Sequence, residues 1–141
     1  MFPRVCLLAI TAAAGLHAQW IPDNPVTAAT RTSDGAQITL QHGTLSVQVC
    51  TDSIIRVRYS PASTFPSQPN NVIIKSTWPQ TQFEFQPGAK EIIINTPRMR
   101  LAVSRADAVI TYADTKGQTL LTDGPRLMTP ITVNGESTHR A

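Results

Sequence analysis

Residues 43–59 decide the fold, and their sequence reads GTLSVQVCTDSIIRVRY. From Thr44 to Cys50, apolar and polar side chains alternate, which is the two-residue period of a β-strand that buries one face. A second alternating run extends from Ile55 to Tyr59, and the Thr51-Asp52 pair between the two runs favours a turn. The stretch therefore predicts two antiparallel strands joined by a short connection.

The same alternation recurs on both sides of this stretch, so the predicted strands follow one another at short intervals. The residues expected to face the core are Ile38, Leu40, Leu45, Val47, Val49, Ile55, Val57, Tyr59, Phe83, Phe85, Ile92, Ile94, Met99, Leu101 and Val103. Residue pairs that suit turns separate the strands, and they are His42-Gly43, Thr51-Asp52, Pro87-Gly88, Lys116-Gly117 and Asp123-Gly124. Hairpins are the expected connections.

Composition favours the same fold class. The β-branched residues Ile, Val and Thr together make up 39 of the 141 residues. No stretch carries an uninterrupted apolar stripe with the 3.6-residue period, which disfavours helices and βαβ units. We therefore predict a single all-β domain, an antiparallel β-sandwich. The net charge of +3 comes from scattered cations and not from a basic run, so nucleic-acid binding is not expected.

Residues 1–18 are typical of a secretory signal peptide. Arg4 precedes an uncharged apolar run, Val5–Leu16, and Ala18 supplies a small residue at the expected cleavage point. The apolar run holds 12 residues, fewer than the roughly 20 that a membrane-spanning helix needs, so no membrane span is expected. We predict an exported protein that is periplasmic or extracellular.

The rest of the chain is expected to divide into a linker and one domain. Residues 19–33 are polar, contain two prolines and show no period, so they predict a flexible linker. Residues 34–141 form the predicted sandwich domain, which we expect to be truncated at its C-terminal end because the chain stops soon after a predicted strand. Removal of the signal peptide leaves Cys50 as the single cysteine, and its thiol is predicted to be half-buried in a strand.

Residues that carry catalytic or metal chemistry are sparse. The two histidines of the mature chain, His42 and His139, lie in a predicted turn and near the C-terminus, where they offer little to a catalytic triad or a metal site. The aspartates stand singly in predicted turns, and the glycines form no phosphate-binding loop. We therefore predict no catalytic residue, no metal site and no cofactor.

Trp78 is the candidate for a carbohydrate contact. It precedes Pro79, which would hold it at a strand end, and a flat indole face suits stacking on the C–H groups of a sugar ring. The alternative is a hydrophobic cap over the edge of the sandwich, which is the commoner fate of a tryptophan side chain.

Four arginines are candidates for contacts with a neighbouring domain. Arg56 and Arg58 flank a core position on one predicted strand, and Arg98 and Arg100 flank Met99 on another. Both pairs are expected to point away from the core. On an isolated sandwich they would form a solvated face, whereas on a docked sandwich their guanidinium groups would pair with carboxylates of a partner domain.

The run from Gly43 to Tyr59 resembles the N-terminal β-sandwich of glycoside hydrolase family 31, the family of α-glucosidases and α-xylosidases. The doubled isoleucine before Arg-Val-Arg-Tyr, followed by a proline-rich loop, is the most specific part of the resemblance. Later stretches occur in the order that such domains show, and they are Val72–Pro79, Arg98–Val103, Ile110–Asp114 with Gly117 and Leu120, and Met128–Pro130. The resemblance covers about residues 34–136.

The resemblance implies a galactose-mutarotase-like sandwich that precedes a catalytic (β/α)8 barrel and packs beside it. It also implies that catalysis depends on two aspartates carried by the barrel, a nucleophile and an acid/base. No residue of this chain matches them, so the chain alone is not expected to hydrolyse a glycoside. The barrel of the parent enzyme and an oligosaccharide are the expected partners. Apolar residues that a barrel would cover, namely Ile54, Ile74 and Ile93, are expected at the surface.

Two other functions stay open. A free-standing carbohydrate-binding module would rest on Trp78, and it predicts saturable quenching of tryptophan fluorescence by oligosaccharides. A structural sandwich domain of the cell envelope predicts self-association through an unprotected edge strand, and no response to sugars.

Overall fold

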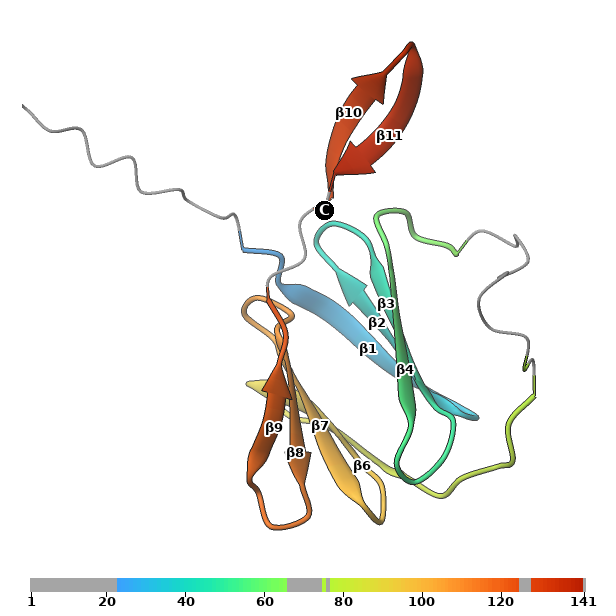
Figure 1. The fold of residues 1–141 in the computed structure, drawn as a ribbon. Helices are drawn as coiled ribbons and strands as arrows, with labels where there is room; N and C mark the ends of the chain where they lie inside the picture. Colours follow the sequence, from blue (N-terminus) through green and yellow to red (C-terminus); the bar gives the residue numbers. More distant parts are fainter. Residues whose placement is uncertain (1–22, 66–74, 76, 125–127, 141) are drawn as a thin grey trace, which may run out of the picture.

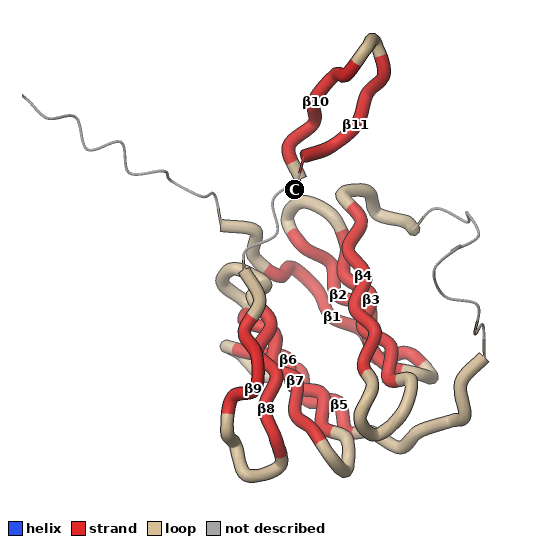
Figure 2. The backbone as a smooth tube through the Cα atoms, in the orientation of Figure 1, coloured by secondary structure: helices blue, strands red, loops and turns tan. Residues whose placement is uncertain are grey.

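The computed structural model describes residues 23–65, 75, 77–124 and 128–140, so the predicted signal peptide lies outside the described residues. The described residues form strands, turns and loops, and none of them lies in a helix (Figure 2). The strands make two antiparallel sheets and a separate two-stranded hairpin (Figure 1). The prediction of an all-β antiparallel sandwich is confirmed.

The first sheet is a meander in which each strand pairs with the next one along the chain. Its strands are β1 (Val26–Thr32), β2 (Gly35–Leu40), β3 (Thr44–Val49) and β4 (Ile55–Ser60). Strands β3 and β4 correspond to the two alternating runs within residues 43–59, and Val47 lies opposite Val57 in their ladder. The strands that this stretch predicts are therefore confirmed.

The second sheet is also a meander and faces the first. Its strands are β5 (Glu84–Pro87), β6 (Glu91–Asn95), β7 (Met99–Ser104), β8 (Ile110–Asp114) and β9 (Thr119–Thr122). Strand β9 forms one edge, and its ladder with β8 shifts register between Tyr112 and Ala113. Two successive leucines on β9, Leu120 and Leu121, are 59% and 58% exposed.

A hairpin follows the second sheet and extends away from both sheets (Figure 1). It consists of β10 (Thr129–Val133) and β11 (Glu136–Arg140). The connecting residues, Asn134 and Gly135, have φ angles of 51° and 84°. Positive φ at both central residues defines a two-residue turn of type I′, for which Asn-Gly is the preferred sequence.

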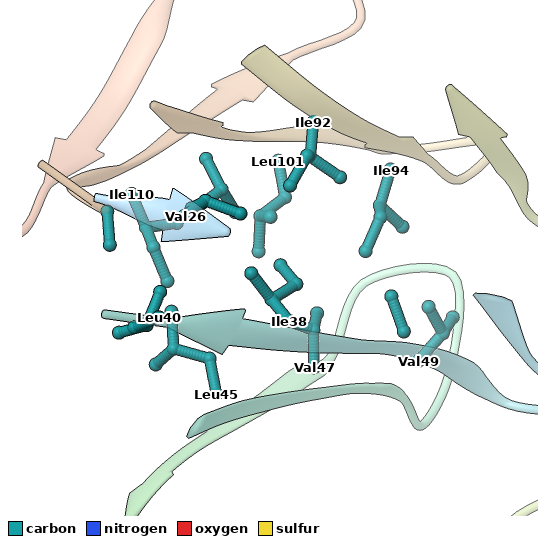
Figure 3. Packing of buried hydrophobic residues seen from close by; sticks show 13 residues of the cluster. Val26, Ile38, Leu40, Leu45, Val47, Val49, Ile92, Ile94, Leu101 and Ile110 are labelled. Atoms are coloured by element: carbon teal, nitrogen blue, oxygen red, sulfur yellow. The ribbon is translucent and has the colours of Figure 1, made fainter. Parts of the chain in front are cut away.

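The two sheets bury one hydrophobic cluster between their facing sides (Figure 3). Because alternate residues of a strand point to the same side, each sheet contributes one apolar face. Full burial of an aliphatic side chain contributes about 1.5–3 kcal/mol to folding. The members of the cluster are Val26, Ala36, Ile38, Leu40, Leu45, Val47 and Val49 on the side of the first sheet and Ile92, Ile94, Leu101, Val103, Ala108 and Ile110 on the side of the second.

Most of the predicted core positions are confirmed. The buried ones are Ile38, Leu40, Leu45, Val47, Val49, Ile92, Ile94, Leu101 and Val103. Five more are partly buried and pack against the cluster, namely Ile55, Val57, Tyr59, Phe83 and Phe85. The prediction is wrong for Met99, which is half-buried and lies outside the cluster, because it begins β7 at the end of the ladder, opposite Asp114.

The predicted linker is wrong for residues 26–32, which form β1. This strand pairs with β2 along its length, with an irregularity between Val26 and Ala28 that breaks the simple alternation of side chains. The buried side chain of Asn24 fixes the start of the strand, since it accepts a hydrogen bond from the His42 amide at 2.8 Å and donates one to the His42 carbonyl oxygen at 2.9 Å. The strand is produced by backbone pairing and by this anchor. Neither of them can be recognised from the pattern of apolar residues.

Gly35 marks a close approach between β2 and β3. A Cβ atom at this position would overlap the carbonyl oxygen of Val47 on β3. The predicted turn at His42-Gly43 is confirmed, and there Gly43 has a φ of 97° and lies against the carbonyl oxygen of Ser60. Both positions therefore need a residue without a side chain.

A polar link joins the turns at one end of the two sheets. Thr96, in the β6–β7 turn, donates a hydrogen bond of 2.6 Å to the carbonyl oxygen of Asp52, in the β3–β4 turn. The Thr96 side chain is buried and also accepts a hydrogen bond from the Met99 amide at 3.0 Å. We call this contact the Thr96–Asp52 link, because it connects the sheets at a sequence separation of 44 residues.

Candidate functional site

The arginines predicted on the first sheet lie on the outer side of β4. They alternate with Val57, which packs against the core, so their side chains leave the opposite face of the strand. Arg58 is exposed, and its guanidinium carbon lies 4.7 Å from the centroid of the Phe65 ring. Arg56 is half-buried and lies opposite Gln48. The outer side of β4 therefore presents two cations, one of which, Arg58, lies against an aromatic ring.

The arginines predicted on the second sheet already have carboxylate partners in the chain. Arg98 lies 3.4 Å from Asp52, and Arg100 lies 3.6 Å from Glu91. The two guanidinium side chains are 72% and 46% exposed, so each ion pair contributes at most about 1 kcal/mol to stability. The prediction that Arg98 lies on a strand is wrong, because it lies in the β6–β7 turn, one residue before β7 begins at Met99, whereas Arg100 lies on β7 and Arg56 and Arg58 lie on β4.

Trp78 lies in the irregular segment that leads from β4 to β5. Its side chain is half-buried, and it does not belong to the hydrophobic cluster between the sheets. The ammonium group of Lys75 lies 4.3 Å from the centroid of the indole ring. The ring therefore combines a cation–π contact with a part that faces solvent.

Cys50 is more buried than the sequence predicts. It follows β3 directly, is 1% exposed, and its thiol donates a weak hydrogen bond to the Gln48 carbonyl oxygen at 3.8 Å. Burial raises the pKa of the Cys50 thiol, and the nearby Arg56 opposes this effect only in part. Because the thiolate is the reactive form, the buried thiol is a packing group and not a nucleophile.

Within residues 23–65, 75, 77–124 and 128–140, no three His, Cys, Asp or Glu side chains gather in a way that would hold a metal ion. The same part of the chain contains no helix that is long and apolar enough to cross a membrane.

A polar groove of about 760 Å³ opens where three parts of the chain meet. Arg31 lies near the end of β1 and Ser33 directly follows that strand; residues 80–84 lead into β5 and include its first residue; and residues 95–97 comprise the last residue of β6 and part of the β6–β7 turn. Sequence analysis missed this groove because its lining comes from separate stretches, none of which forms a motif. We call it the β1–β5 groove.

Comparison with known proteins assigns the domain. Residues 44–139 match the model of the glycosyl hydrolase 31 N-terminal galactose mutarotase-like domain. The search of curated protein sequences gave no match.

Two solved structures share the fold. The GH31 α-xylosidase from Xanthomonas citri superposes with a TM-score of 0.67 and 20% sequence identity, over 77% of this chain and 12% of the xylosidase. A mutant of the GH31 dextranase from Flavobacterium johnsoniae, complexed with isomaltotriose, superposes with a TM-score of 0.62 and 16% identity, over 81% of this chain and 14% of the dextranase. The matched region is therefore a small part of each of these longer proteins.

The family match spans strands of both sheets and includes most of the stretch with which the sequence analysis began. The two solved structures share this fold although their sequence identity to the chain is only 20% and 16%. This chain belongs to the family of glycosyl hydrolase 31 N-terminal galactose mutarotase-like domains.

Proposed function

We propose that the chain acts as the non-catalytic N-terminal domain of an exported glycoside hydrolase family 31 enzyme, in which it packs beside the catalytic barrel. The observation that carries this proposal is the match of residues 44–139 to the N-terminal domain of that family. The groups that hydrolyse α-glycosides would then belong to the barrel. The contribution of this domain is structural support for the barrel.

Exposed apolar side chains support a docking role. Ile54, in the β3–β4 turn, is 49% exposed, as expected for a residue that a neighbouring domain would cover. Ile93 is only half-buried, and Ile74 lies outside the described residues. Contact with a barrel would remove such apolar surface from water, which contributes about 25 cal/mol for each Å² buried.

The four arginines provide the charged part of the proposed contact. Arg58 and Arg98 are the more accessible members of their pairs, and a guanidinium group presents a planar fork that matches a carboxylate. Arg98 would exchange or share its partner Asp52 on docking. Trp78 is the proposed carbohydrate contact within the parent enzyme, because part of its ring faces solvent.

The decisive experiment follows the native protein in its source organism. An antibody raised against this chain is used to blot cell and exported fractions, and the DNA downstream of the Ala141 codon is sequenced. We expect an exported protein several times larger than 15.3 kDa, with a barrel that carries paired aspartates encoded downstream. An exported product no larger than this chain would refute the proposed role.

A second test concerns catalysis. The purified chain is incubated with 4-nitrophenyl α-glucoside and 4-nitrophenyl α-xyloside, and the release of nitrophenol is followed by absorbance. No release above the buffer control is expected. Sustained release that survives repurification would show that this domain is itself catalytic.

A further inference from the structure

The β1–β5 groove is lined mainly by polar side chains that can form hydrogen bonds, together with the aromatic ring of Phe83. Arg31 extends from the end of β1, and its guanidinium carbon lies 4.7 Å from the centroid of the Phe83 ring. Phe83 is partly buried and packs against the hydrophobic cluster, so its ring provides a fixed surface for the Arg31 guanidinium group. The guanidinium group is thereby held at the groove while its N–H donors stay available.

The carboxylate of Glu84 supplies the acidic side of the groove, and two long hydrogen bonds position it. Glu84, the first residue of β5, accepts hydrogen bonds from the side-chain amides of Asn95 at 3.5 Å and Gln86 at 3.4 Å. Both bonds are long, so the carboxylate keeps capacity for a stronger donor. Asn95 itself lines the groove and is positioned by its strand, β6.

Three further polar residues of the groove, Ser33, Gln80 and Gln82, are exposed. Their hydroxyl and amide groups act as both donors and acceptors, so they are accessible to a ligand in the groove.

The charges of the groove select the chemical class of its ligand. One guanidinium group, Arg31, and one carboxylate, Glu84, line it together with amides and hydroxyls, so its formal charge is zero. An anion would meet Glu84 and a cation would meet Arg31, whereas a neutral polyhydroxylated molecule can donate to one and accept from the other. The volume of about 760 Å³ lies within the range of roughly 300–1,000 Å³ that is usual for small-molecule sites.

We propose that the β1–β5 groove is a binding site for a neutral saccharide, with Arg31, Gln82 and Glu84 as its central contacts. Trp78 does not line this groove, so the site differs from the sugar contact proposed there, and it does not depend on docking of a barrel. It would let the domain hold a segment of a carbohydrate chain through hydrogen bonds to ring hydroxyls.

The experiment uses the full chain labelled with ¹⁵N, and it records amide spectra during titration with maltotriose and, separately, isomaltotriose. We expect saturable shifts of the Arg31 and Gln82 backbone amides and of the side-chain amide of Asn95. The Arg31→Ala variant is expected to raise the dissociation constant about tenfold, because a charge-assisted hydrogen bond to a hydroxyl is lost.

The matched control is Arg58→Ala, since Arg58 stacks on Phe65 at the same distance of 4.7 Å but lies outside the groove. Its dissociation constant should equal that of the wild type. Gln82→Ala provides a second variant inside the groove in case Arg31→Ala perturbs the end of β1, and it should weaken binding as well.

Three outcomes would overturn the proposal. The first is the absence of saturable shifts with both trisaccharides, and the second is shifts confined to Trp78 and Lys75, which do not line the groove. The third is tighter binding of glucose 6-phosphate than of either trisaccharide, which would indicate an anion site. None of these results changes the size or the catalytic behaviour of the native protein, so they leave the proposed docking role to its own test.

Discussion

The β2–β3 pair and the edge strand β9 are built from similar residues but lie in opposite environments. On the pair, Ile38 and Leu45 stand directly opposite each other and are both 0% exposed. On β9, Leu121 stands opposite Tyr112 and is 58% exposed. A leucine in a paired strand is therefore fully buried in one strand and open to solvent in the other.

The difference separates what makes a strand from what makes it stable. Backbone pairing with a neighbour is enough to form β9, although the strand is short, lies at an edge and has an irregular register. Burial requires in addition an apolar face of the other sheet. Ile38 and Leu45 lie among the buried residues of both sheets (Figure 3), whereas Leu120 and Leu121 of β9 do not belong to this cluster. Stability should accordingly be concentrated in the middle of the sandwich.

The sharpest test of this contrast truncates one leucine in each region. Leu45→Ala is expected to lower the free energy of unfolding by about 4 kcal/mol, because it leaves a cavity between the sheets. Leu121→Ala should cost less than about 0.5 kcal/mol, since its side chain is largely in water already. Urea denaturation followed by circular dichroism measures both, and equal losses would contradict the contrast.

A second test adds an atom to the β2–β3 pair. Gly35→Ala places a Cβ against the carbonyl oxygen of Val47, so the strands must separate and stability should fall by about 3 kcal/mol. Gly124→Ala is the control, because a Cβ there meets no atom within 4 Å. The midpoints of thermal unfolding report both variants, and an unchanged midpoint for Gly35→Ala would argue against the close approach.

A third test concerns the anchor of β1. Asn24→Ala leaves the His42 amide without its buried acceptor, and we expect a loss of roughly 1–2 kcal/mol. Asn95→Ala is the comparison, because the hydrogen bond from that side chain to Glu84 is exposed and 3.5 Å long. Hydrogen exchange of the β1 amides should accelerate in Asn24→Ala only. Equal protection of β1 in both variants would mean that the anchor is dispensable.

The smallest expected effect is a pH dependence of the free energy of unfolding that arises from Cys50. Burial raises the pKa of its thiol in the folded state, so folded Cys50 holds its proton more tightly than the unfolded chain does. The stabilisation is complete below the unfolded pKa of roughly 8.5 and is lost as pH rises through the folded value. The difference in unfolding free energy between the wild type and Cys50→Ala should therefore shrink above about pH 9. A constant difference up to the alkaline limit would contradict this assignment.

The central strands could be predicted because each buries one face and leaves the other in water. Leu45, Val47 and Val49 alternate with polar residues, and this period alone locates β3 and its inward face. Strand β1 escaped prediction because its irregularity falls between Val26 and Ala28 and its anchor is a polar side chain. The hairpin turn at Asn134-Gly135 was missed as well, although Asn-Gly between alternating residues is a strong turn signal.

The candidate site was less predictable than the fold. The exposure of Ile54 follows from its position out of phase with the core, and the structure confirms it. The ion pairs of Arg98 and Arg100 depend on the partner that a turn or a neighbouring strand supplies, which no local pattern encodes. The β1–β5 groove likewise exists only after three distant stretches have come together.

The meander topology has a consequence for how the chain folds. Within each sheet every pairing joins strands that are consecutive in sequence, so the loops that must close are short and cost little entropy. The apposition of the two faces and the Thr96–Asp52 link, by contrast, join residues that are far apart in the chain. We therefore expect the hairpins of each sheet to form first. Packing of the two sheets against each other should then limit the folding rate. Because the Thr96–Asp52 link joins turns of the two sheets, it would form late in folding, only when the sheets pack together.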